Sequence, residues 1–492
     1  MLRRHWLKTV ACAGLLPMPA RRAAAQDAPA SSPPKLAAPG LAERLAAYAA
    51  GLRYGDLDGA TIERIKSHLV DTLGCGVAAY DEGPVRTCRE IALAAGSQAS
   101  SVIGSAGRTT PDLAAFANGA AFRYYDLNDV YVGRATCHPS DNIAACLAVA
   151  EAQGSSALEL ITAIALAYEI DCRLADAFDL GARGWDDATV FSLPAAALAA
   201  GALMKLPAQR LAQAVGLALN DHIPLGQTRA QTLSDWKGLA DADAARSGVF
   251  AAMLARAGLT GPAPIFEGRR GFFQLVSGPA EVDVDTFGGR ERAFKIHECG
   301  MKAYPVVVYA QTAVAASVAV AREAGDLNRI SRLEITTTPQ GYVSAGRDPE
   351  KWTPENRDTA DHSLPYIVAR ALFDGDIDND SYAPGKLRDP KILDFMRKIT
   401  VVQDPALVTP HGAAPPIRIT ADLGDGGRIV REVSAMPGFA GLAMSREDVE
   451  RKFRSNVGKR WARERIESTL RTLWSLEKAG DARTLLAGLR SA

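Results

Sequence analysis

The sequence has 492 residues, of which 48% are hydrophobic and 23% are charged, and its 56 Lys and Arg residues balance its 56 Asp and Glu residues. This composition is typical of a globular protein and excludes a disordered or collagen-like chain. The neutral balance argues against a nucleic-acid binder, which carries an excess of Lys and Arg. A chain of this length suggests about three domains, and one or two large ones fit equally well.

The first predicted element, residues 1–25, has the layout of an export signal. It contains five basic residues and no acidic residue, an apolar run from Thr9 to Leu16 and a small-residue end at Ala25. Its Arg-Arg-x-Trp-Leu-Lys core is similar to a twin-arginine signal. We therefore expect a periplasmic protein with a flexible leader over 26–39, or a cytoplasmic protein if the signal is not functional. Without this segment 51 basic residues face 56 acidic ones, so the mature chain is negatively charged.

The rest of the chain contains no apolar stretch of the roughly 18 residues that a membrane span needs, so we expect no membrane span. None of the seven cysteines forms a C-x-x-C pair, which disfavours zinc ribbons and iron–sulfur clusters. One or two disulfides remain open in an exported protein, and the sequence does not assign them.

Residues 40–296 carry long Ala/Leu-rich runs closed by Gly or Pro, a pattern that predicts buried helices. The same pattern, now more charged, returns over 437–492. Together these two stretches predict one large all-helical domain. The predicted helices are Leu41–Leu52, Ala60–Ala79, Ile143–Gln153, Leu158–Ala177, Pro194–Met204, Ser445–Gly458 and Ala462–Ala479.

Residues 297–436 have a different texture, and they predict a smaller α+β domain inserted into the helical one. Alternating apolar and polar residues predict strands over 330–338 and 417–422, and a turn at Asp425-Gly-Gly427 leads into a third strand over 428–433. Helices are expected over Pro305–Glu323 and near Ser363–Leu372. The predicted fold class is therefore mainly α with an α+β part.

Several common catalytic motifs do not occur in the sequence. No G-x-G-x-x-G follows a predicted strand, and neither a P-loop nor a G-x-S-x-G elbow is present. His297-Glu298 is not followed by a second histidine one turn later, as a zinc-binding helix requires. The sequence therefore predicts no metal and no nucleotide cofactor.

The most polar interruption of the helical part runs from Tyr124 to Asp129 and is followed by Cys137-His138-Pro139-Ser140. Ionisable groups between apolar helices are costly to bury unless they are paired or used. The alternative is a satisfied polar loop, in which Asp129 caps a turn and His138 bonds to the backbone. Ser140 or Asp141 is expected to cap the helix that begins near Asn142.

Three further polar clusters open predicted helices. Lys237 precedes a small-residue helix, Lys302 precedes a Pro-started one, and Thr359–Tyr366 opens a third. A lysine supplies a point charge for a carboxylate. Singly, such lysines are more often solvated surface charges. Together, the clusters predict the walls of one anion-binding site.

These clusters carry a resemblance to a known family. The run from Asn118 through Asp126 to His138-Pro-Ser, and the motifs around Lys237, Phe266, Lys302 and 360–366, resemble the MmgE/PrpD family of 2-methylcitrate dehydratase-like proteins. The resemblance implies a large helical domain with a smaller α+β lid domain. It also implies a metal-free homodimer that acts on a small polycarboxylate by dehydration, decarboxylation or epimerisation.

By this resemblance, Asp126, His138, Lys237, Lys302 and Tyr366 are the expected catalytic residues. Elimination of water needs a base, an acid and cations that neutralise the carboxylates, and these residue types supply all three. We expect Asp126 to fix the orientation or protonation of the His138 ring. The substrate-binding residues expected from the same clusters are Asp129, Ser140, His362 and Ser363.

The sequence departs from the family pattern where many members have a second histidine. Here Gly184-Trp185-Asp186 stands in its place, and a carboxylate would repel an anionic substrate. Val130 and Val306–Val308 replace other polar positions of the family. A cofactor-independent dehydratase-type lyase is the function we expect. An epimerase or decarboxylase on the same scaffold and a non-catalytic exported carboxylate-binding protein are the alternatives.

Overall fold

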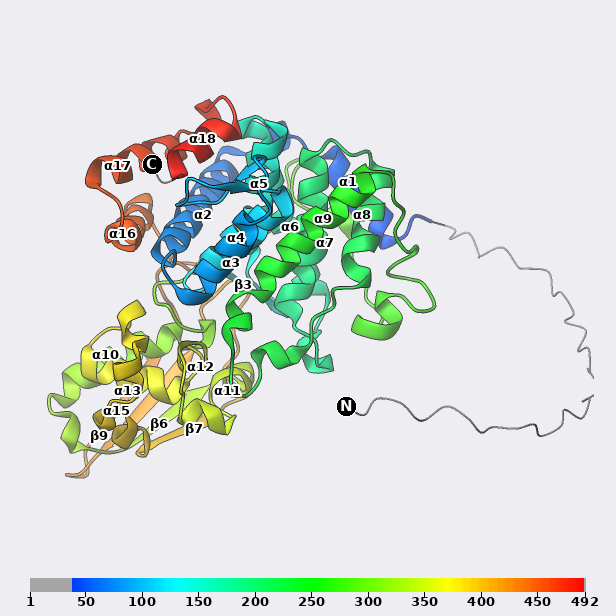
Figure 1. The fold of residues 1–492 in the computed structure, drawn as a ribbon. Coiled ribbons are helices and arrows are strands. Elements are labelled where there is room, and N and C mark those ends of the chain that lie inside the picture. Colours follow the sequence, from blue (N-terminus) through cyan, green and yellow to red (C-terminus); the bar gives the residue numbers. More distant parts are fainter. Residues whose placement is uncertain (1–37, 491–492) are drawn as a thin grey trace, which may run out of the picture. The chain divides into compact units, whose positions relative to one another are not determined.

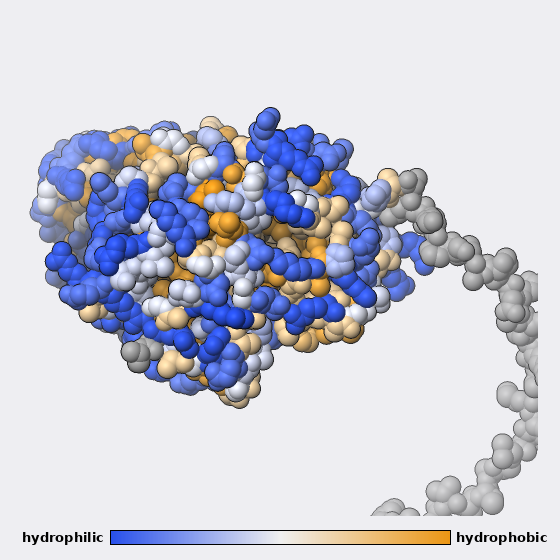
Figure 2. All heavy atoms as spheres, turned by 90° about the horizontal axis from the view of Figure 1, so that it is seen from above, coloured by the Kyte–Doolittle hydropathy of each residue, from blue (hydrophilic) through white to orange (hydrophobic). Residues whose placement is uncertain are grey.

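The computed structural model describes residues 38–490 of the chain. The predicted export signal over 1–25 lies outside the described residues, as does the predicted leader up to residue 37. Within the described part, no helix is both long and apolar enough to cross a membrane. Hydrophilic side chains cover much of the face drawn in Figure 2, and hydrophobic ones form smaller patches between them.

One apolar core is built by residues 41–301 together with residues 449–489, and it consists mostly of helices. These helices are α1 (Leu41–Gly51), α2 (Gly59–Ala78), α3 (Gly83–Leu93), α4 (Pro111–Arg123), α5 (Ile143–Gln153), α6 (Ala157–Ala177), α7 (Asp187–Leu203), α8 (Ala208–Asn220), α9 (Ala240–Arg256), α16 (Arg446–Val457), α17 (Arg463–Trp474) and α18 (Ala482–Leu489). Helix α7 contacts α6, α8 and α9 (Figure 1). Its side chains are buried almost without exception, as expected for a helix that is apolar on every side.

The predicted start of α7 at Pro194 is wrong, because the helix begins at Asp187 and contains the proline in its interior. A proline inside a helix removes one hydrogen bond and costs about 3 kcal/mol. The burial of nearly every other side chain of α7 outweighs this cost. A single breaker residue therefore does not end a helix that is enclosed by other helices.

Four short strands interrupt the part that we predicted to be all-helical, so that prediction is wrong in this detail. They are β1 (Ser100–Ser101), β2 (Arg108–Thr109), β3 (Asp129–Val132) and β4 (Thr136–Cys137). A fifth short strand, β5 (Gly300–Met301), lies in the predicted α+β part. Strand β3 is the centre of a three-stranded antiparallel sheet with the order β4-β3-β5. In its register Asp129 lies opposite Met301, and Tyr131 lies opposite Cys137.

A second apolar core is built by residues 306–429 around a four-stranded sheet with the order β7-β6-β8-β9. Strand β6 is parallel to β7 and antiparallel to β8, and α10 contacts β8, β9 and α13 (Figure 1). The elements are β6 (Ile330–Thr337), β7 (Ile399–Gln403), β8 (Ile417–Leu423), β9 (Arg428–Val433), α10 (Gln311–Ala324), α11 (Pro339–Ala345), α12 (Arg357–Ala360), α13 (Leu364–Asp374), α14 (Pro384–Leu387) and α15 (Pro390–Met396). The fold is thus mainly helical with small sheets, as predicted.

The helix predicted to begin at Pro305 begins at Gln311 instead. The side-chain amide of Gln311 accounts for this later start of the helix. Its oxygen accepts hydrogen bonds from the backbone N–H groups of Ala303 and Tyr304, and its nitrogen donates to the carbonyl oxygens of Tyr304 and Val306. These four bonds hold the residues that follow Lys302 in an irregular loop.

Candidate active site

The small sheet around β3 brings three of the predicted catalytic residues together. Asp126 lies three residues before β3, His138 follows β4 directly, and Lys302 follows β5 directly. Because β4 and β5 both pair with β3, backbone hydrogen bonds set the spacing of residues that are up to 176 positions apart in the chain. The predicted grouping of Asp126, His138 and Lys302 matches this geometry.

Asp126 lies at the centre of a group of buried cations. Its Oδ2 is 2.8 Å from Nζ of Lys302, its Oδ1 is 3.9 Å from Nζ of Lys237, and Oδ1 also pairs with the Arg123 guanidinium. Burial alone would raise the pKa of Asp126, but the three cations outweigh burial and hold the pKa well below its usual range. The carboxylate is therefore ionised at neutral pH. Its backbone has a φ of 51°, a left-handed conformation that few non-glycine residues adopt and that is found at functional sites.

Lys302 contacts both the side chain and the backbone of Asp126. Besides its ion pair with the side chain, Nζ donates to the Asp126 carbonyl oxygen at 3.0 Å. Burial lowers the pKa of Lys302 to about 8, while Asp126 raises it and Arg123 lowers it further. An ammonium with a pKa near 8 is mostly protonated at pH 7 and gives up its proton far more readily than a lysine in water.

The His138 ring is oriented by a backbone contact, and Asp126 acts on its protonation only by raising its pKa against burial. Nδ1 of His138 is 2.7 Å from the carbonyl oxygen of Asp129. Since a carbonyl only accepts hydrogen bonds, Nδ1 carries the proton and the lone pair is on Nε2. Burial, Arg123 and Lys302 hold the pKa of His138 well below its usual value. The ring is therefore neutral and can accept a proton.

Lys237 connects this group to the α+β part of the chain. Its Nζ is 3.2 Å from both carboxylate oxygens of Asp361, and Oδ1 of Asp361 is 2.6 Å from Nδ1 of His362. Burial, reinforced by Lys237, lowers the pKa of His362 to about 3 even though Asp361 opposes the shift. Lys237 and His362, which the sequence placed in separate clusters, thus share one carboxylate.

Asp129 and Ser140, predicted to bind substrate, are fully used inside the protein. Asp129 Oδ2 accepts a hydrogen bond from the Tyr168 hydroxyl at 2.6 Å and lies 2.9 Å from Nδ1 of His68. Its Oδ1 accepts from the Ser140 backbone N–H at 3.1 Å. The Ser140 hydroxyl accepts from the Asn128 amide at 2.9 Å. These groups support the turn that carries His138, as in the satisfied-loop alternative.

The expected cap at Ser140 or Asp141 is not formed. Residues Pro139–Asn142 make a 3₁₀ turn that runs into α5, and no side chain caps this helix. The Asp141 carboxylate accepts a hydrogen bond from Asn128 at 2.9 Å and lies 3.5 Å from Nε of Arg123. Both side chains point back to the loop and not along the helix.

Two residues of the last cluster, Ser363 and Tyr366, have structural contacts away from the cations. The Ser363 hydroxyl accepts from the backbone N–H of Tyr366 and caps α13. The Tyr366 hydroxyl donates to the Ser381 carbonyl oxygen at 2.6 Å. The Tyr382 hydroxyl donates to the Pro305 carbonyl oxygen at 2.9 Å, and burial raises its pKa, with smaller contributions from Asp361 and Asp126.

Asp186, which we expect at the position of a family histidine, has its charge compensated. Its Oδ1 is 3.2 Å from Nε of Arg229, and its Oδ2 accepts from the Thr189 hydroxyl at 2.9 Å. Arg229 also pairs with Asp241 at 3.0 Å. Burial raises the pKa of Asp186 in spite of Arg229. The expected repulsion of an anionic substrate is therefore weaker than the sequence implies.

Sequence reasoning missed four charged residues that surround the predicted ones. Arg123 follows the uncharged run 113–122, a signal that could have revealed it, whereas Asp241 and Lys351 have other charged residues beside them in the sequence. Asp241 links two of the group, because its Oδ2 is 3.3 Å from Nε of Arg123 and 3.0 Å from Arg229. The four residues are Arg123, Arg229, Asp241 and Lys351.

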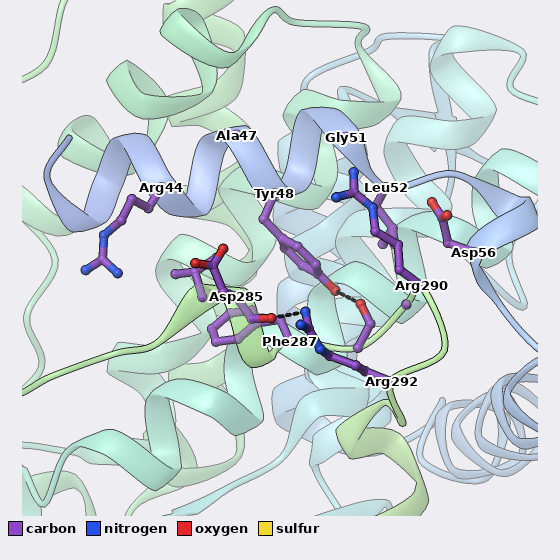
Figure 3. A pocket seen from close by; sticks show the side chains of 13 residues that line it. Arg44, Ala47, Tyr48, Gly51, Leu52, Asp56, Asp285, Phe287, Arg290 and Arg292 are labelled. Carbon is purple, nitrogen blue, oxygen red and sulfur yellow. Dashed lines mark hydrogen bonds between the residues drawn. The ribbon is translucent and has the colours of Figure 1, made fainter. Parts of the chain in front are cut away.

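A cavity of about 370 Å³ lies elsewhere in the helical part and shares none of these residues. Arg44, Arg290 and Arg292 line it beside Asp56, and the Tyr48 hydroxyl donates across it to the Gly288 carbonyl oxygen at 2.9 Å (Figure 3). All three arginines are exposed. This arginine pocket is a second place where an anion can bind, and binding experiments need a control for it.

The residues that the structure describes include no group of three or more His, Cys, Asp or Glu side chains that could hold a metal ion. The six described cysteines are buried and free. Two of them, Cys172 and Cys299, have sulfur atoms 3.6 Å apart.

The chain is similar to curated enzymes of two kinds over most of its length. Human cis-aconitate decarboxylase is 25% identical over 467 residues, which cover 92% of this chain and 94% of that protein. The 2-methylcitrate dehydratase of Cupriavidus necator is 28% identical over 379 residues, covering 72% of this chain and 76% of the enzyme. The 2-methylcitrate dehydratase of Escherichia coli K12 is 26% identical over 430 residues, covering 80% and 85%.

Two family models also match the chain. The model of the MmgE/PrpD N-terminal domain matches residues 43–285, and the model of the C-terminal domain matches residues 304–476. The first match contains Asp126, His138 and Lys237, and the second begins two residues after Lys302. Since the two matches follow each other in order and span most of the described residues, the protein belongs to the MmgE/PrpD family.

Proposed function

We propose that the protein is a cofactor-independent lyase of the dehydratase type that acts on a small polycarboxylate. One observation carries the proposal: a neutral histidine and a lysine with a lowered pKa lie among buried cations that can neutralise carboxylates. Enzymes usually obtain an acid and a base from two titratable groups whose surroundings keep one protonated and the other unprotonated. The names of the relatives, dehydratases and decarboxylases of citrate-like acids, support the same class of substrate.

In the proposed reaction Nε2 of His138 takes a proton from the carbon next to a carboxylate. The electron pair of that C–H bond forms the C=C bond, and the C–O bond breaks. The ammonium of Lys302 gives its proton to the departing hydroxyl, so the products are an unsaturated carboxylate and water. Lys237 and Arg123 stabilise the negative charge that develops on the substrate carboxylate. Proton exchange between the imidazolium and the neutral amine then restores the starting state.

The substrate also raises the basicity of His138. In the ligand-free protein nearby cations disfavour the imidazolium. A bound polycarboxylate brings negative charges that offset these cations, and an opposite charge nearby favours the protonated ring. His138 therefore becomes a stronger base when the correct anion is bound.

The predicted domain layout is part of this proposal. We propose that residues 297–436 act as a lid domain on a helical domain formed by 40–296 and 437–492. The two separate apolar cores support the division, and the Lys237–Asp361 pair supports a contact between the parts at the site. We further propose that the mature protein is an exported homodimer, as the N-terminal pattern and the family resemblance imply.

The direct test incubates the purified mature protein with citrate and with 2-methylcitrate. Ultraviolet absorbance of the new double bond reports dehydration, deuterium uptake from solvent without net conversion reports epimerisation, and release of carbon dioxide reports decarboxylation. We expect dehydration. We expect His138→Gln and Lys302→Met to lower turnover by about 10²- to 10⁴-fold, the usual contribution of one acid or base, while Lys391→Met, at an exposed position, leaves turnover unchanged.

The pH profile tests the assignment of the acid. If Lys302 donates the proton, turnover falls as pH rises through about 8, because the ammonium is then lost. A rate that rises through this pH would make Lys302 the base and would contradict the assignment. Full activity of both His138→Gln and Lys302→Met would contradict the proposal as a whole, and binding without any of the three conversions would favour a carboxylate-binding protein.

A further inference from the structure

The ammonium group of Lys351 is buried and makes no hydrogen bond to any described residue. The residue lies in the 3₁₀ turn Pro349–Trp352 and has no exposed surface. Its backbone is held, because its N–H donates to the Asp348 carbonyl oxygen at 3.0 Å and its carbonyl oxygen accepts from the Ser363 hydroxyl. Its Nζ has no hydrogen-bond partner within residues 38–490. The turn is fixed, and the charged end of the side chain is not satisfied.

This state distinguishes Lys351 from the other buried lysines of the described chain. Lys66 donates to the Trp474 carbonyl oxygen at 3.0 Å, Lys237 pairs with Asp361, and Lys302 pairs with Asp126. An isolated buried ammonium is costly and is normally paired. Lys351 is the exception.

The Lys351 ammonium is within reach of charges that belong to the group of cations described above. The two strongest charge effects on it come from Asp361 and Asp348, followed by Lys237. Both of these carboxylates, Asp361 and Asp348, already have other hydrogen-bond partners. Asp361 is shared by Lys237 and His362, and Asp348 accepts hydrogen bonds from Arg347 and from the Gln231 backbone N–H. Burial lowers the pKa of Lys351 to about 8, so that the group still carries its charge in most molecules at pH 7.

We propose that Lys351 is a third substrate-binding lysine, contributed by residues 306–429, and that it binds the carboxylate by which a tricarboxylate differs from a dicarboxylate. The inference rests on the proposed function, since it assumes a polycarboxylate beside Lys237 and Lys302. Lys351 then adds a third cation to Lys237 and Arg123, the two groups that the proposed reaction places at the substrate carboxylates. A substrate carboxylate supplies the partner that Lys351 lacks, and a charge-assisted hydrogen bond of this kind adds strongly to affinity. Lys351 thereby determines which class of acid the site prefers.

The test uses two unreactive probes that differ in one group. Tricarballylate is glutarate with an additional central carboxylate, and neither carries a hydroxyl that can be eliminated. Calorimetric titration of the wild-type mature protein should give clearly tighter binding of tricarballylate. We expect Lys351→Met to weaken tricarballylate binding by about ten- to hundredfold, the loss of one charged hydrogen bond, and to leave glutarate binding within about twofold. The control Lys391→Met, at an exposed lysine of the same region, should change neither.

The melting temperature of the ligand-free protein is the second measurement. Methionine has a similar length and no charge, so Lys351→Met should melt at the wild-type temperature or above it. A lower melting temperature, or failure to fold, would show that the ammonium stabilises the ligand-free protein and would overturn the inference. An unchanged affinity for tricarballylate, or an equal loss for both probes, would also overturn it.

The two proposals fail in different ways. If the wild-type protein binds neither probe, the proposed function fails and the inference fails with it. If the wild-type protein binds tricarballylate and Lys351→Met binds it equally well, only the inference fails. Arg290→Gln removes one arginine of the pocket in Figure 3 and is the control for binding in that pocket. If this variant no longer binds the probes, the probes bind in the arginine pocket and not beside the lysines. That result would count against both the proposed function and the inference on Lys351.

Discussion

Replacing Asp126 by asparagine removes one negative charge from a place where three buried cations meet, and it preserves the shape of the side chain. Two of the cations keep other partners. Arg123 still has Asp241 at 3.3 Å, and Lys237 still has Asp361 at 3.2 Å. Lys302 loses its ion pair and keeps only the backbone carbonyl oxygen at 3.0 Å. The cost of the substitution should therefore come mainly from Lys302.

The geometry sets the size of this cost. Two unit charges 2.8 Å apart attract each other by about 6 kcal/mol when the effective dielectric constant is about 20. Part of this attraction only offsets the desolvation of both groups, and removal of one partner from a buried pair costs about 3–5 kcal/mol in practice. We expect Asp126→Asn to lower the free energy of unfolding by about this amount at about pH 6.

The cost should decrease as pH rises. Without Asp126, which raises the pKa of Lys302, that pKa falls below its wild-type value of about 8. Between the two pKa values the folded wild-type protein holds the Lys302 proton and the folded variant does not. The difference in unfolding free energy therefore shrinks by about 1.4 kcal/mol per pH unit in this window and is constant above pH 8. Both unfolded chains have an ordinary lysine, so they do not contribute to the difference.

Urea unfolding, followed by tryptophan fluorescence between about pH 6 and about pH 9, measures both effects. Asp394→Asn is the matched control, because Asp394 is 70% exposed and pairs with Arg397 at 3.5 Å; it should change stability by less than about 0.5 kcal/mol at every pH. A cost of Asp126→Asn that stays the same across this range would refute the reasoning, since Lys302 would then not respond to Asp126.

Three further predictions concern other parts of the protein. Gly248→Ala places a Cβ atom 2.6 Å from a side chain and 2.8 Å from a backbone nitrogen of α7, and it should lower the free energy of unfolding by about 1–3 kcal/mol. Its control is Gly488→Ala, where the Cβ atom meets open space and should stabilise α18 by up to about 1 kcal/mol. Urea unfolding measures both. His68 has a pKa lowered by burial to about 4, so the unfolded chain binds more protons and stability rises between pH 4 and about 6.5; His68→Asn should make the acid side of a stability–pH curve less steep by up to about one proton. Arg229→Met should cost about 3–5 kcal/mol, because it leaves the buried Asp186 carboxylate without its cation and takes one of two cations from Asp241, and adding Asp186→Asn should recover part of this loss in thermal unfolding.

Three of the four strands in the sheet around β6 could be predicted closely because each has one face in the core. Strand β9 has the predicted bounds, and β6 and β8 differ from the prediction by one residue, whereas β7 was not predicted. Every second residue of β8 is buried along most of its length, so the sequence alternates and a shift of register would expose the apolar face. Local patterns of this kind are read reliably without knowledge of the fold.

The starts of α7 and α10 could not be predicted because distant groups decide them. The first depends on neighbours that enclose Pro194, and the second depends on the Gln311 amide, which binds backbone groups that precede it. In both cases a proline near the helix gave the usual local signal, and tertiary contacts overrode it. Sequence patterns do not contain this information.

The candidate site was predictable in its central members and not in its surroundings. Asp126, His138 and Lys302 stand out because they lie in polar clusters between apolar stretches and because these clusters resemble the family's motifs. Arg229 and Lys351 have ordinary local sequences, and only the fold shows that one compensates Asp186 and the other has no partner. Tyr366 and Ser363 are the opposite case. The sequence motif made them expected site residues, but in the structure their side chains make local structural contacts.

The proposed proton-transfer residues and the proposed tricarboxylate-binding lysine come from different parts of the chain. The two proposed proton-transfer residues, His138 and Lys302, follow strands that pair with β3 through backbone hydrogen bonds, whose geometry does not depend on side-chain identity. Lys351 and Asp361 come from residues 306–429 instead. Substitutions there can change which acid is accepted while the reacting pair stays in place. The proposed preference for a tricarboxylate therefore depends on one residue of the second core, whereas the proposed proton transfers depend on residues fixed by the β3 sheet.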